Sequence, residues 1–128
     1  MLEDEYLRAA STANEAGKQY LEAVRVGESR QRLTDLALDA RDLWAAVSTI
    51  CALGEEEARL KVANPPLRHR QQATNSAWID RRNWAVRAED ASARSQAAGA
   101  LMSAHLGQTS PDREALRLVS VKGWSSQS

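Results

Sequence analysis

Acidic side chains are the strongest candidates for chemistry in this sequence. Asp35, Asp39 and Asp42 follow one another at spacings of four and three residues, which places them on one side of a helix. Glu15 lies on an earlier helical stretch. Because Mg²⁺ prefers oxygen ligands, Glu15 together with Asp35, Asp39 and Asp42 could hold this ion. The alternative is an ordinary solvated helix face, in which these carboxylates pair with neighbouring arginines.

The same region carries a family resemblance. Its residues are Asn14-Glu15-Ala16-Gly17-Lys18, then Asp39-Ala40-Arg41-Asp42-Leu43-Trp44, Leu53-Gly54, Lys61 and Asn64. This pattern resembles the all-α nucleoside triphosphate pyrophosphohydrolases of the MazG type, and it spans about 50 residues. The resemblance implies Mg²⁺-dependent cleavage of a nucleotide between its phosphates, with Glu15, Asp39 and Asp42 as ligands. Lys18 stands where that family has a second glutamate, and Asp39 is a shorter side chain than the family's glutamate.

The sequence offers few residues for other kinds of catalysis. The two histidines, His69 and His105, have no glutamate three residues before them, and Cys51 sits in an apolar helical stretch typical of core. We expect His105, near a helix C-terminus, to be a partly protonated imidazole that interacts with the helix dipole. There is no Gly-x-Ser-x-Gly elbow and no glycine-rich phosphate loop. We therefore predict no catalytic residues and no cofactor, with Mg²⁺ needed only under the pyrophosphohydrolase alternative.

Arginine and tryptophan side chains form the candidate binding surface. Arg81, Arg82, Arg87 and Trp78 lie close together in the sequence, and both residue types are common where proteins bind partners. Trp84 follows Trp78 by six residues, so the two rings cannot share one helical stripe, and we expect Trp78 to be the exposed one. Guanidinium groups beside aromatic rings can also bind nucleic acid. Neighbouring carboxylates disfavour that alternative.

Helical spacing organises the elements that position these residues. Apolar or small residues recur every three or four positions, which predicts helices over about 2–26, 28–63 and 74–106. Pro65 and Pro66 must end the second helix, and Thr74 or Asn75 is the expected N-cap of the third. Residues 1–107 would then form a helical hairpin or bundle, and 108–128 a short helix with a flexible tail. Ser110 is the expected N-cap of the short helix, with Pro111 as its first residue.

The seam of the two long helices is predicted from the same spacing. In the second helix it comprises Leu33, Ala37, Ala40, Trp44, Val47, Cys51, Gly54, Ala58 and Lys61. In the third it comprises Ala77, Asp80, Trp84, Arg87 or Ala88, Ala91, Arg94, Ala98, Leu101 and His105. Such small residues let helices approach closely, which favours a coiled-coil-like antiparallel hairpin with the Pro-Pro segment as its turn. The fold class is therefore all-α.

Composition bears on assembly. The chain has 128 residues, no Phe, and equal numbers of acidic and basic residues, so it carries no overall field for nucleic acid. Its core is rich in Ala and thin in large apolar side chains. Either the chain breaks at Gly27 and folds into a three-helix bundle, or the first segment extends and pairs with a second subunit. We favour the second, a homodimer that completes a helical bundle.

Together these features favour a small non-enzymatic interaction protein. It would act as an adaptor, inhibitor or assembly factor by binding a macromolecular partner, most simply a protein, and such proteins are encoded by bacteria and phages. The alternatives are the MazG-like pyrophosphohydrolase and a nucleic-acid-binding accessory protein. The sequence has no apolar stretch of membrane-spanning length, so we expect no membrane association. The expected location is the cytoplasm, or the host cytoplasm or virion for a phage protein.

Overall fold

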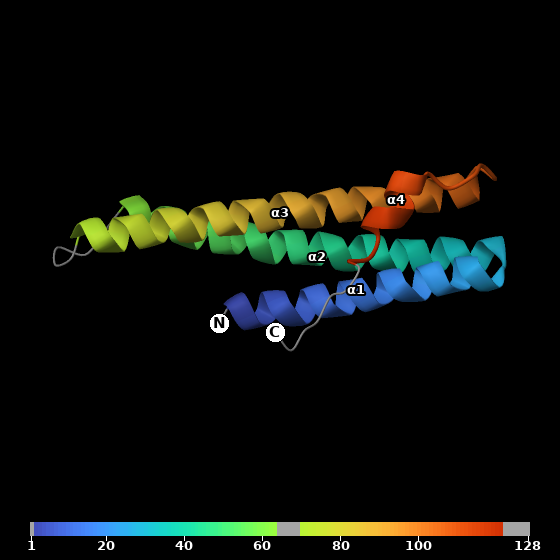
Figure 1. The fold of residues 1–128 in the computed structure, drawn as a ribbon, viewed down its shortest axis with the longest axis horizontal. Coiled ribbons are helices and arrows are strands. Elements are labelled where there is room, and N and C mark those ends of the chain that lie inside the picture. Colours follow the sequence, from blue (N-terminus) through green and yellow to red (C-terminus); the bar gives the residue numbers. More distant parts are fainter. Residues whose placement is uncertain (1, 64–69, 122–128) are drawn as a thin grey trace.

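The described part of the chain folds into four helices (Figure 1). The computed structural model describes residues 2–63 and 70–121, which contain α1 (Leu2–Val26), α2 (Arg30–Ala63), α3 (Arg70–Leu106) and α4 (Arg113–Leu118). Within these residues there is no strand, so the all-α prediction is confirmed. α3 begins at Arg70, four residues before Thr74, so Thr74 and Asn75 lie inside the helix. The prediction that one of them is the N-cap is therefore wrong. The Pro-Pro turn and the tail beyond residue 121 lie outside the described residues.

The chain reverses direction at Gly27. This residue has a φ of 76°, a left-handed conformation that glycine adopts without steric cost. The Gly27 amide donates to the carbonyl of Val24 and the Glu28 amide to that of Ala23, which is the hydrogen-bond pattern of a Schellman C-cap. The Ser29 hydroxyl then accepts from the amide of Arg32 and caps the start of α2. α1 therefore folds back along α2 within the same chain.

The sequence favoured an extended first segment that pairs with a second subunit. That prediction is wrong, because α1 folds back and its apolar side is covered by α2 of the same chain. α2 packs against both α1 and α3, and its predicted seam is buried from Ala37 to Ala58, although Lys61 is exposed. On α3 the seam prediction holds for Ala91, Ala98 and Leu101, whereas Asp80 is exposed. The alanine-rich seam is therefore buried within one chain, between α2 and its neighbours α1 and α3.

α1 is too short to cover the whole hairpin. At about 1.5 Å per residue, its 25 residues span about 37 Å, whereas the 37 residues of α3 span about 55 Å. The hairpin of α2 and α3 consequently extends past the start of α1 (Figure 1). Two large apolar side chains in the first third of α3 are exposed: Trp78 is 51% exposed and Ile79 is 61% exposed.

The short helix α4 begins two residues later than predicted. Its N-cap is Asp112, whose carboxylate accepts a hydrogen bond from the amide of Ala115 at 3.2 Å. The prediction of Ser110 as cap and Pro111 as first helical residue is therefore wrong. An aspartate caps as well as a serine, and its negative charge also favours the helix N-terminus.

Residues 118–121 form a C-terminal segment that three polar side chains bind, one from each long helix. From α3, Arg94 donates to the carbonyl of Leu118 at 2.8 Å. From α2, the indole Nε1 of Trp44 donates to the carbonyl of Val119 at 3.0 Å. From α1, the Asn14 amide oxygen accepts from the hydroxyl of Ser120 at 3.0 Å and from the amide of Val121 at 2.6 Å. This segment thus joins the three long helices around one buried polar network.

Candidate functional site

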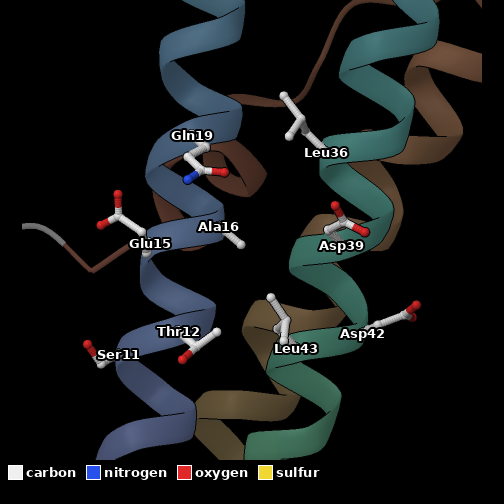
Figure 2. A pocket seen from close by; sticks show the side chains of 9 residues that line it. All are labelled: Ser11, Thr12, Glu15, Ala16, Gln19, Leu36, Asp39, Asp42 and Leu43. Atoms are coloured by element: carbon white, nitrogen blue, oxygen red, sulfur yellow. The ribbon is translucent and has the colours of Figure 1, made fainter.

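The predicted metal ligands line one hollow but do not converge. A hollow of ≈ 590 Å³ between α1 and α2 is lined by Glu15, Asp39 and Asp42 together with Leu36 and Leu43. Figure 2 shows the Glu15 and Asp42 carboxylates pointing away from one another, with Leu43 in the space between the helices. Across the described ranges, no three His, Cys, Asp or Glu side chains are grouped so that they could hold a metal ion.

The geometry required by the pyrophosphohydrolase alternative is therefore missing for Glu15, Asp39 and Asp42. All three side chains are exposed, and Asp42 accepts a hydrogen bond at 3.2 Å from the neighbouring Arg41. Asn14, next to Glu15 in the resembling motif, is buried and bound to the C-terminal segment. The physical reason is that the spacing of side chains along one helix does not set their direction relative to side chains on another helix.

Trp78, Arg81 and Arg82 do form one surface, which we call the Trp-Arg surface. The Arg81 guanidinium carbon lies 5.4 Å from the centroid of the Trp78 ring, within the range of a cation–π interaction. Arg82 and Ile79 border the same open hollow, to which α2 contributes Glu55. The prediction that Trp78 is the exposed tryptophan is confirmed.

Arg87 does not belong to the Trp-Arg surface. Its NH1 and NH2 donate to the Glu3 carboxylate at 2.6 and 2.9 Å, and its guanidinium lies over the rings of Tyr6 and Trp84. This hydrogen bond lowers the pKa of Glu3 and raises that of Arg87. Arg87 therefore joins α3 to the start of α1. Its nine-residue offset from Trp78 corresponds to opposite sides of a helix, a signal that the sequence already contained.

Cys51 has the core role that its apolar surroundings predict. It is fully buried, and burial raises the pKa of its thiol to about 11. The thiol therefore stays protonated at neutral pH and is a poor nucleophile or metal ligand. His69 lies outside the described residues.

His105 is buried rather than partly protonated at a helix end, so that expectation is wrong. Its Nε2 shares a hydrogen bond of 2.5 Å with the hydroxyl of Tyr20 on α1, and only 8% of the residue is exposed. Burial lowers the pKa of His105 below its ordinary value of 6.5, and burial raises that of Tyr20 to about 12. Both groups are therefore neutral at pH 7, and the Tyr20 hydroxyl can donate to the unprotonated nitrogen.

We expect the fold to lose stability below about pH 6.5 because of His105. Its pKa is lower in the folded state, so in this range the unfolded chain binds the proton that the folded chain resists. Above that range both states are neutral and the contribution of this group is constant. Urea unfolding at pH 7.5 and pH 5.5 should show the loss, and His105→Gln should reduce it. An equal loss in the variant would contradict a neutral, buried His105.

Comparison with known proteins finds no protein-family model, no curated protein and no solved structure that matches the chain. Within residues 2–63 and 70–121, no helix is both long enough and apolar enough to cross a membrane.

Proposed function

We propose that this chain is a non-enzymatic helical interaction protein that binds a protein partner through the Trp-Arg surface. The observation that carries the proposal is Trp78, which is half exposed, lies beneath the Arg81 guanidinium and adjoins exposed Ile79. Tryptophan and arginine dominate the binding energy of many interfaces. The tryptophan ring buries a large apolar area, and the guanidinium group of arginine donates several hydrogen bonds in fixed directions. The role would be that of an adaptor, inhibitor or assembly factor of bacterial or phage origin, acting in the cytoplasm.

The position of this surface supports the proposal. It borders an open hollow that is lined by α3 and by Glu55 of α2, so a partner can reach it without displacing any helix of the bundle. The buried network and the Arg87–Glu3 pair lie elsewhere and hold the fold together. Binding and stability therefore depend on different side chains.

Photo-crosslinking tests the surface directly. A benzophenone amino acid at Ile79 should give adducts of discrete mass in cells that express the protein, because this side chain is 61% exposed beside Trp78. The matched control is Leu106, which is 64% exposed at the far end of the same helix and should give none. Reversing charge with Arg81→Glu and Arg82→Glu should remove the adducts while helicity by circular dichroism stays unchanged. Equal adducts at both positions would contradict the proposal.

The other two functions have their own tests. Nucleic-acid binding would use Trp78, Arg81 and Arg82, but Glu55 lines the same hollow and repels phosphate. Affinity for an oligonucleotide that falls steeply with salt would favour it over a protein partner. Mg²⁺-dependent release of pyrophosphate from nucleoside triphosphates would overturn the non-enzymatic role, since it requires the carboxylates of Glu15, Asp39 and Asp42 to act together.

A further inference from the structure

The outer face of α3 is a continuous exposed stripe. We define it as Trp78, Ile79, Arg82, Val86, Glu89 and Ala93, all of which are exposed. Trp78, Arg82, Glu89 and Ala93 stand at spacings of four, seven and four residues, so they follow one line along the helix, with Ile79 and Val86 beside it. The stripe holds three large apolar side chains and one charge of each sign.

The order of residues along this stripe is self-complementary. A two-fold axis between Ala85 and Val86 would set two copies of α3 antiparallel. In that register Arg82 lies opposite Glu89 of the partner subunit, and by symmetry Glu89 lies opposite Arg82 of the partner subunit. The same register places the large Trp78 ring opposite Ala93 of the partner subunit, where the small methyl group leaves room for it. An isologous interface needs this kind of symmetry, in which one patch serves both subunits.

We propose that the partner bound by the Trp-Arg surface is a second copy of this chain, which docks antiparallel along the outer face of α3. This inference rests on the proposed function and names its partner. The charges favour a second copy, because a uniformly acidic partner or a nucleic acid would meet Glu89 as well as Arg82. Among the described residues, neither Arg82 nor Glu89 takes part in an intramolecular ion pair, so both charges are available to a partner subunit.

The expected dimer is weak. One helix pair buries less than the roughly 800 Å² per partner of a standard interface, so dissociation in the micromolar range is expected. The exposed halves of the two Trp78 side chains would supply much of the contact. Sedimentation equilibrium or light scattering over that concentration range should give a mass approaching twice the chain's 14.1 kDa.

A charge swap tests the register. Arg82→Glu alone and Glu89→Arg alone should each weaken dimerisation roughly tenfold or more, because both symmetric ion pairs become repulsive. The double variant Arg82→Glu/Glu89→Arg should restore the dimer, since the pairs form again with exchanged signs. Arg113→Glu on α4, an exposed charge away from the stripe, is the matched control and should leave the mass unchanged.

The outcomes separate this inference from the proposed function. A monomeric wild-type chain at every concentration, or a double variant as monomeric as the single ones, would overturn the antiparallel self-association. If Ile79 adducts then contain a different protein, the interaction role stands and only the second copy is wrong. If the chain is monomeric and Ile79 gives no adducts, both are wrong. Circular dichroism of each variant verifies that helicity is retained.

Discussion

Replacing Gly17 by alanine should destabilise the protein by about 2 kcal/mol, even though alanine is the better helix former. A Cβ atom at this position would lie 1.9 Å from the carbonyl oxygen of Val119 and 2.8 Å from its carbon. These are backbone atoms that cannot rotate away, so residues 118–121 would have to move off α1. That movement would stretch the hydrogen bonds made by Trp44 and Asn14. Urea unfolding followed by circular dichroism measures the loss.

Gly99 is the matched control for this substitution. It also lies inside a long helix, but its Cβ would meet only the flexible side chain of Arg41, at 3.5 Å. Gly99→Ala should therefore stabilise the protein by up to about 1 kcal/mol through helix propensity. If the free energy of unfolding falls for Gly17→Ala and rises for Gly99→Ala, the close approach of α1 to Val119 is the cause of the destabilisation. A stabilised Gly17→Ala variant would mean that the C-terminal segment does not contact α1 there.

Trp44→Ala should be the most damaging substitution of a single side chain, with an expected loss of about 4 kcal/mol. Trp44 is 2% exposed and packs in a core cluster with Val47, Cys51 and Ala91. Its removal would leave a cavity and would also leave the carbonyl of Val119 without the indole donor. The free energy of unfolding from urea denaturation measures this loss, unless the variant fails to fold.

Two further substitutions make the test of Trp44 specific. Trp44→Phe keeps most of the apolar volume but removes the indole donor, so its loss should be intermediate, about 1–3 kcal/mol. Trp78→Ala removes a half-exposed ring and should change stability by less than about 0.5 kcal/mol. Comparable losses in Trp44→Ala and Trp78→Ala would contradict the different burial of the two rings.

Much of the local structure could be predicted from the sequence because its determinants are local. The three-and-four spacing of small residues placed the long helices and most of the buried side of α2, including Trp44 and Cys51. The six-residue offset between Trp78 and Trp84 correctly indicated which ring is exposed. The same rule, applied to the nine-residue offset between Trp78 and Arg87, would have removed Arg87 from the binding surface.

Helix ends were predicted less well. Ser110 and Asp112 are both good N-caps, and Thr74 and Asn75 are good caps at which α3 does not begin. Capping preferences differ by less than the free energy that helix packing supplies, so the tertiary contacts select among the candidates.

The amino-acid pattern alone is therefore enough to place the long helices and to identify the apolar side of each. Three features depend on how the helices pack: α1 folds back at Gly27, the carboxylates of Glu15 and Asp42 point apart, and Arg87 binds Glu3. The same packing lets Asn14 hold the backbone of Val121. The difference lies in separation along the sequence, because helical periodicity is encoded in residues only three or four positions apart. A contact such as Asn14 with Val121 depends on how whole helices pack.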